Sequence, residues 1–282
     1  MKEMTLQTAD EVFSFFDLSE EHWKSTDPTS SFGFRGQGSS AWDLSPSAFR
    51  KSRELKNIDQ ILAEHLLIDH FYRETSAQGI FHSTARLPSR DEIVSGLRVS
   101  TMSQGLEDSV WPTVECYEII ALAQHYGLPT RLLDISNNPL VALYFAVTDS
   151  VCATTEEEMA VYFFKTDNRK LIRTKSDHRN TFQNVKRYQL VNAPSFFNEY
   201  IRAQKGFFLG YFEDHLKATD LFTPLPLEEC LGNELTKVLI PGNRRVEIQQ
   251  GLAKRFVDER TIFPGLSGIV SYLKREMKSQ GI

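Results

Sequence analysis

Apolar residues recur along the chain with two different spacings, which predict a mixture of helices and strands. Thr8 and Glu11 have the spacing of a capping box ahead of an apolar run, so we expect a first helix near residue 9. The segment SFGFRGQG at 31–38 is typical of a short strand that ends in glycines. Residues 57–78 carry apolar side chains at helical spacing and predict a long helix.

The second half of the chain mixes both kinds of element. Residues 114–126 predict a helix that ends at Gly127 and Pro129, and the TRLLDI that follows is typical of a strand. The apolar segment NNPLVALYFAV predicts a helix capped by Asn137 or Asn138. Further strands are expected at 159–165, 206–212 and 236–241, and closing helices at 243–256 and 265–277.

This order of elements indicates the α+β or mixed α/β class. We expect one domain over residues 1–282, with a mostly helical insertion at 52–109 that covers or flanks the functional site. The strands that hold Arg35, residues 132–134 and residues 207–209 should lie in one region of the sheet, because each adjoins a polar cluster.

Composition and charge limit the classes of function. The chain of 282 residues has a net charge of −5, which argues against nucleic-acid binding through bulk electrostatics but leaves room for a local basic cleft. No apolar run of about 18 residues is present, so no membrane span is expected. The N-terminus lacks the apolar segment of a signal peptide, and the three cysteines form no CxxC pair. We therefore expect a cytoplasmic protein without a metal site.

Arg35 is the first candidate for chemistry. It follows an aromatic residue in the predicted strand, and Gly36 and Gly38 let a backbone or a ligand approach closely. A guanidinium at such a place can present a planar fork to a phosphate or a carboxylate. A structural salt bridge beside a tight turn is an equally simple interpretation, and the sequence leaves both open.

A second set of polar residues lies in AQHYGLPTRLLDISNNPLVALYFAV, residues 123–147. His125, at a predicted helix end, is either a candidate site residue or a core histidine that the helix dipole favours. Strand alternation puts Arg131 and Asp134 on opposite faces, so each needs a different partner. Arg35 is a candidate partner for one of them.

A third set lies in EYIRAQKGFF, before an apolar strand. Arg202 and Gln204 would share a face if this segment were extended. An edge strand with ordinary polar residues is the alternative. No GxSxG motif accompanies these residues, so a nucleophile of that kind is not predicted.

With these residues in view, the chain resembles the FRG domain family, named after the triplet that is here Phe34-Arg35-Gly36. One departure is Ile135, which stands where the family usually has an aromatic residue. The resemblance runs from Phe34 to Lys274 in four blocks, which are FRGQGSSAWDLSPSAFR, the 123–147 segment, RAQKGFF, and KVLIPGNRRVEIQQGLAKRFVDERTIFPGLSGIVSYLK.

The order of parts is also similar to the ADP-ribosyltransferase fold. That resemblance implies a mainly antiparallel sheet core, NAD as the substrate, and transfer of ADP-ribose to a nucleic-acid or protein acceptor by a toxin or phage-defence effector. It implies cofactor-binding roles for Arg35, Gly36, Gln37, Tyr126 and Thr130, with Arg35 on phosphate. The catalytic roles it implies fall to His125, Arg131, Asp134 and Gln204.

The expected catalytic glutamate is not evident, and Gln204 stands near its place. Asp134 or Glu199 could supply the carboxylate that stabilises an oxocarbenium-like state. Two alternatives therefore remain. The first is a non-catalytic module that binds a nucleotide or phosphate, and the second is a nuclease-like effector, against which the lack of a carboxylate cluster for Mg²⁺ counts.

Overall fold

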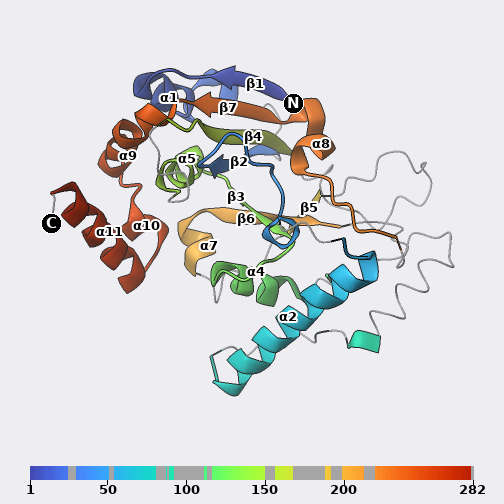
Figure 1. Cartoon of the computed structure of the whole chain (residues 1–282). Coiled ribbons are helices and arrows are strands. Elements are labelled where there is room, and N and C mark those ends of the chain that lie inside the picture. The colour runs from blue at the N-terminus through green and yellow to red at the C-terminus, as the bar shows by residue number, and fades with distance from the viewer. Residues whose placement is uncertain are drawn as a thin grey trace.

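Seven strands form one sheet in the computed structural model (Figure 1). Their order is β1-β7-β4-β2-β3-β6-β5, and each neighbouring pair is antiparallel except β1 with β7. The strands are β1 Lys2–Thr5, β2 Ser30–Gln37, β3 Leu132–Ser136, β4 Met159–Asp167, β5 Tyr188–Val191, β6 Gly206–Tyr211 and β7 Thr236–Ile240. The structure describes residues 1–24, 30–50, 54–80, 87, 89–91, 111–112, 116–149, 156–167, 188–191, 199–212 and 220–280.

The sheet confirms the predicted class, a mixed fold with a mainly antiparallel sheet. The strands that hold Arg35, residues 132–134 and residues 207–209 are β2, β3 and β6, which are consecutive in the sheet as predicted. The short edge strands β1 and β5 were not predicted, because four residues give too little alternation to distinguish a strand from a loop.

Helices surround this sheet. In Figure 1, α9, α10 and α11 gather on the left, while α2 and α4 lie along the lower edge. The helices of the described residues are α1 Ala9–Phe15, α2 Asn57–Ala77, α4 Tyr117–His125, α5 Pro139–Thr148, α7 Glu199–Ala203, α8 Leu227–Leu231, α9 Arg245–Lys254, α10 Glu259–Ile262 and α11 Leu266–Ser279.

Two of the predicted helix starts are confirmed at the level of hydrogen bonds. Thr8 and Glu11 form the reciprocal capping box of α1. The Asn138 side chain accepts a hydrogen bond from the Leu140 amide at 3.0 Å and so caps α5, whose first residue is Pro139.

Two other sequence expectations fare differently. Residues 199–203 are helical, so Arg202 does not share a strand face with Gln204, and the extended interpretation was wrong. Helix α2 lies inside the insertion predicted at 52–109, but residues 81–86 and 92–110 lie outside the described residues. The insertion as a whole and the single domain over 1–282 therefore stay predictions.

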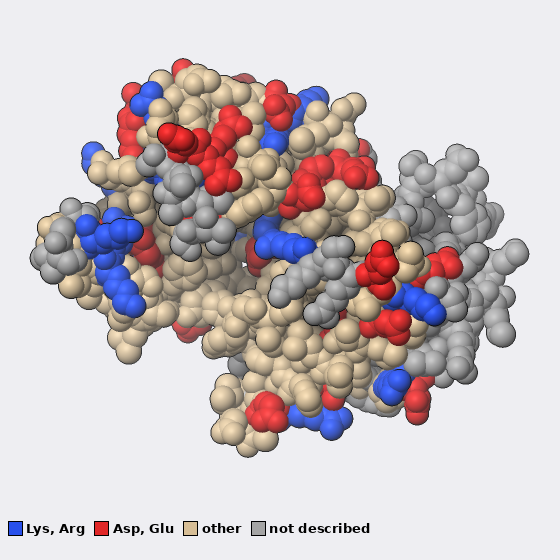
Figure 2. Space-filling view, in the orientation of Figure 1, with Lys and Arg blue, Asp and Glu red and all other residues tan. Residues whose placement is uncertain are grey.

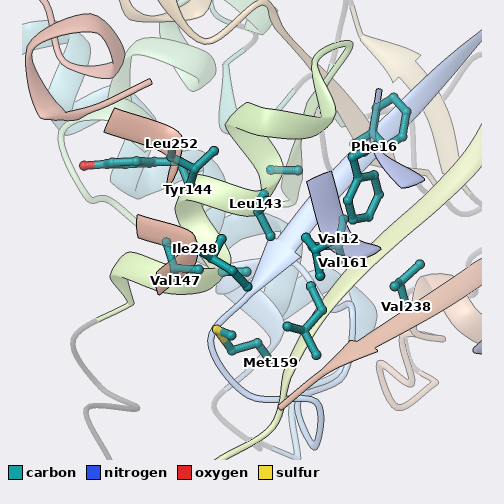
Figure 3. Close-up of a cluster of buried hydrophobic side chains, with 14 of the residues drawn as sticks. Val12, Phe16, Leu143, Tyr144, Val147, Met159, Val161, Val238, Ile248 and Leu252 are labelled. Atoms are coloured by element: carbon teal, nitrogen blue, oxygen red, sulfur yellow. The ribbon is translucent and has the colours of Figure 1, made fainter. Parts of the chain in front are cut away.

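The core follows from strand alternation. Phe34, Val161 and Val238 point to the face that α1, α5 and α9 cover, and Figure 3 shows this cluster. Leu133 and Tyr162 point to the opposite face, where a second cluster lies. The sheet is thus buried on both sides, and burial of this apolar surface is the main source of its stability.

Helix α5 lies in direct contact with the backbone of β2. A methyl group built at Gly36 would overlap the Ala142 carbonyl, so the helix can approach this closely only over a glycine. The buried guanidinium of Arg245 holds the end of the same helix: it donates to the Ala146 and Val147 carbonyls at 2.8 and 3.2 Å and to the Gly38 carbonyl at 3.1 Å. These contacts fix the middle and the end of α5 against β2 and the residue that follows it.

A buried ion pair joins α2 to the sheet. Arg131 is 2% exposed, and its Nε and Nη2 donate to the two Glu64 carboxylate oxygens at 2.6 and 3.0 Å. Its Nη1 donates to the carbonyls of Trp111 and Tyr211 at 3.3 and 3.2 Å. Because these Arg131 nitrogens donate to acceptors within the core, Arg131 has a structural role.

Glu64→Gln should destabilise the protein strongly. The change leaves the Arg131 guanidinium buried without its counter-charge, which typically costs about 3–5 kcal/mol of unfolding free energy. Chemical denaturation of the variant and the parent would measure the difference. Asp69→Asn is the matched control on the same helix, because its exposed partner Arg73 makes a surface pair worth less than about 1 kcal/mol. Equal losses in the two variants would contradict the assignment.

Gly36→Ala should also lower stability, by about 1–3 kcal/mol or more, because the added methyl group forces α5 away from β2. Thermal unfolding followed by circular dichroism would show a melting temperature several degrees below that of the parent. Gly206→Ala is the control, since a methyl group at that strand glycine meets its nearest atom at an ordinary 3.6 Å. A Gly36→Ala protein as stable as Gly206→Ala would show that the close approach is not required.

Candidate functional site

Strands β2 and β3 pair at one point and then diverge. Their register contains the single pair Phe34 and Ser136, whereas β2 pairs with β4 along all eight of its residues. Beyond that pair, the Arg35 side chain reaches β3 and donates from Nη1 to the Asp134 carbonyl at 2.8 Å. The same nitrogen lies 3.7 Å from the Asp134 carboxylate. Arg35, expected to be the partner of either Arg131 or Asp134, is thus the partner of Asp134.

A cavity of about 630 Å³ opens beside this divergence. One wall, here called the strand wall, comes from β2, β3, β6, the end of α4 and the α7 segment; the other, the helix wall, comes from α5, α10 and α11. Figure 2 shows this face of the molecule hollowed near its centre, with acidic and basic side chains at the rim. The predicted site residues that line the cavity are Arg35, Gly36, His125, Asp134 and Gln204.

The other four predicted site residues do not line it. Arg131 is in the core with Glu64, as described above. Gln37 is 5% exposed and donates to the Asp43 carbonyl at 3.2 Å. Tyr126 is 68% exposed, and Thr130 is buried. Sequence reasoning grouped them with the site because they are neighbours in the chain, but alternation and helix ends turn their side chains elsewhere.

Arg35 is the cation of the strand wall. Its side chain is 14% exposed, and burial lowers the pKa of the guanidinium while Asp134 opposes that shift. The Nε atom is buried without a hydrogen-bond partner in the described part of the chain. An unpartnered buried donor is unusual and leaves the guanidinium able to bind an additional acceptor.

Asp134 is held by a short chain of hydrogen bonds. The Gln124 amide nitrogen donates to its carboxylate at 2.7 Å, and Thr130 donates through its hydroxyl to the Gln124 side-chain oxygen. Thr130 thus acts on the site through Gln124. The carboxylate itself remains 58% exposed, so a ligand can reach it.

His125 lies at the end of α4 and packs against Tyr200, with ring centroids 3.6 Å apart and ring planes inclined by 33°. Burial lowers the pKa of the imidazole, and the nearby Asp134 carboxylate only partly offsets this. The ring is therefore neutral near pH 7. A neutral imidazole suits contact with a planar group or a hydroxyl better than pairing with an anion.

Gln204 links the two walls. Its side-chain nitrogen donates to the Ile262 carbonyl at 3.4 Å, and its backbone carbonyl accepts from the Ser136 hydroxyl at 2.7 Å. The residue therefore ties the end of α7 both to β3 and to α10. Its amide is positioned by these contacts at the cavity surface.

The helix wall holds residues that the sequence analysis did not single out. Glu259 lines the cavity and accepts from Arg275 Nε at 2.9 and 3.1 Å, one distance to each oxygen. Asp258 caps α10 through a reciprocal bond with Thr261, and this Asp-x-x-Thr spacing is the signal that could have placed Glu259 at a helix start. Tyr144 was assigned to an apolar helix, although Figure 3 shows its hydroxyl pointing away from the apolar cluster.

Metal-binding groups and membrane-spanning helices can be assessed for the described residues. Within them, no group of three or more His, Cys, Asp or Glu side chains could hold a metal ion. Among the helices of the described part of the chain, none is long and apolar enough to cross a membrane.

Comparison with known proteins gives one family. The model of the FRG domain matches residues 30–155, which include the first two blocks of the resemblance and the strand-wall residues Arg35, His125 and Asp134. The chain has no match among the curated proteins or the solved structures. The chain therefore contains an FRG domain, as its sequence predicts, over less than half of its length, and the match includes residues of both cavity walls.

Proposed function

We propose that the cavity binds NAD and that the chain is an ADP-ribosyltransferase-like enzyme. The observation that supports this most is the convergence of Arg35, His125, Asp134 and Gln204 on one cavity, although they come from four separate elements. A volume of about 630 Å³ lies within the usual range of small-molecule sites. We also propose that the core is related to the ADP-ribosyltransferase type.

Arg35 is proposed to hold the pyrophosphate. Its buried Nε has no partner among the described residues, and Arg35 is the one lysine or arginine among the described residues that line the cavity. A guanidinium matches the geometry of phosphate oxygens, and a charge-assisted bond of this kind contributes about 1.5–3 kcal/mol. In this arrangement Arg35 would turn from the Asp134 backbone toward the ligand.

The remaining residues are given roles according to their contacts. The neutral ring of His125 would stack on or hydrogen-bond to the substrate, and the Gln204 amide would act at the ribose or the acceptor. Asp134 is the exposed carboxylate of the strand wall and would stabilise positive charge that develops on the ribose. The acceptor is proposed to be a nucleic acid or a protein, and the enzyme a cytoplasmic effector of toxin or phage-defence type.

A second candidate function is a non-catalytic module that binds a nucleotide or phosphate. One observation favours it: two of the carboxylates that line the cavity are already engaged, Asp134 by Gln124 and Arg35, and Glu259 by Arg275. A binding module needs only the Arg35 guanidinium to hold phosphate and the His125 ring to contact a planar group. NAD turnover distinguishes the two functions.

Arg35→Ala should weaken NAD binding by about one to two decades, because one charged contact to phosphate is lost. Arg35→Lys should restore little of the affinity, since an ammonium cannot reproduce the planar fork. Calorimetry would measure the affinity, and release of nicotinamide would measure turnover. Arg202→Ala is the matched control, because Arg202 is an exposed arginine of α7 that does not line the cavity.

Thermal unfolding separates binding from folding in the same variants. If Arg35 serves only as the structural partner of Asp134, Arg35→Ala should unfold at a lower temperature and bind NAD as well as the parent does. That outcome would contradict the phosphate role. A parent protein that binds NAD without releasing nicotinamide, in the presence of mixed protein and nucleic-acid acceptors, would favour the binding module.

A further inference from the structure

The helix wall of the cavity differs in chemistry from the strand wall. Three aromatic rings meet there: Tyr144 and Phe145 from α5, and Phe263, which follows α10. Their centroids lie 5.7 to 6.3 Å apart, and each pair is steeply inclined, at 64° to 82°. The rings therefore pack edge to face, and Phe145 and Phe263 are partly exposed while Tyr144 is buried.

Acidic side chains accompany these rings. Glu259 and Asp149 line the same wall, and Asp134 lies across the cavity. Among the lining residues, all of which belong to the described part of the chain, Arg35 is the one lysine or arginine. The lining therefore carries three carboxylates against one guanidinium. A cavity with this balance favours a ligand that brings a positive charge.

Glu259 can still bind a ligand although it has a partner. Arg275 contacts both of its oxygens through a single nitrogen, Nε, and Arg275 itself is not part of the cavity lining. A carboxylate can accept about four hydrogen bonds, so acceptor capacity remains on both oxygens. The nearness of this charge to the rings is consistent with the pKa of the Tyr144 phenol, which burial raises first and Glu259 raises further.

We propose that the helix wall is a subsite for a planar organic cation, held against the partly exposed rings of Phe145 and Phe263, on which the buried Tyr144 packs, and by the carboxylates of Glu259 and Asp149. Aromatic faces carry negative potential and attract cations, and a flat cation adds stacking to that attraction. This inference rests on the proposed function only in taking the cavity as the ligand site, and it requires no NAD turnover.

Two sources could supply such a cation to this cavity. One is the pyridinium ring of an oxidised nicotinamide dinucleotide, and the other is the guanidinium of an arginine side chain in a protein acceptor. Both are planar and positively charged, and each has a neutral counterpart of almost the same shape. The counterparts allow charge to be tested without changing the protein.

Calorimetry with four probes tests the proposal on the unmodified protein. 1-Methylnicotinamide should bind at least about fivefold more tightly than its neutral counterpart N-methylnicotinamide, which carries the methyl group on the amide nitrogen. If the source is an acceptor arginine, acetylarginine methylamide should show the same preference over acetylcitrulline methylamide. Equal affinities within both pairs would overturn the subsite.

Two substitutions locate the effect. Glu259→Gln should reduce the preference for the cation severalfold, while Glu276→Gln should leave it unchanged, because Glu276 pairs with the same Arg275 at 3.1 Å but does not line the cavity. Phe263→Leu should weaken the binding of both the charged and the neutral probe of each pair, and the affinity of the charged probe should fall more. A preference that survives Glu259→Gln in full would refute the assignment. If the protein prefers the charged probes but neither binds nor turns over NAD, the result would support the subsite and contradict the proposed enzymatic activity.

Discussion

The contact between α5 and β2 is the constraint on which the site depends. Helix α5 can rest on the strand only because Gly36 has no side chain opposite the Ala142 carbonyl, and Arg245 then fixes the end of the helix to the turn after β2. The same helix supplies Tyr144 and Phe145 to the cavity. The distance between the strand wall and the helix wall is therefore set by backbone packing, which resists change because protein interiors are densely packed.

The site also depends on the divergence of β2 from β3. This divergence leaves room for a charged side chain where a regular sheet would have backbone hydrogen bonds. Continued pairing would satisfy the Asp134 carbonyl with a strand amide, but here the Arg35 guanidinium satisfies it. The structural and functional interpretations of Arg35 are thus compatible. One of its nitrogens closes the gap between the strands, while its Nε is buried without a partner among the described residues.

Much of this could be predicted from the sequence where the signal is local. The caps at Thr8 and Asn138 and the opposite facing of Arg131 and Asp134 follow from spacing alone, and the structure agrees. The remainder depends on contacts between distant segments. Arg131 finds its partner 67 residues away, and Glu259 joins a cavity whose other wall begins at Phe34. No spacing rule contains such contacts, because tertiary packing decides them.

The paired charges of the cavity restrict what it can bind. Arg35 faces Asp134 and Glu259 faces Arg275 on the opposite wall, so a ligand with one charge can address one wall and gains nothing on the other. A ligand with an anionic and a cationic part can address both walls, and each of its charges then has an opposite charge beside it rather than being buried alone. The arrangement therefore selects for a bipolar ligand, and the rigid spacing that Gly36 permits selects for one whose charges are correctly separated.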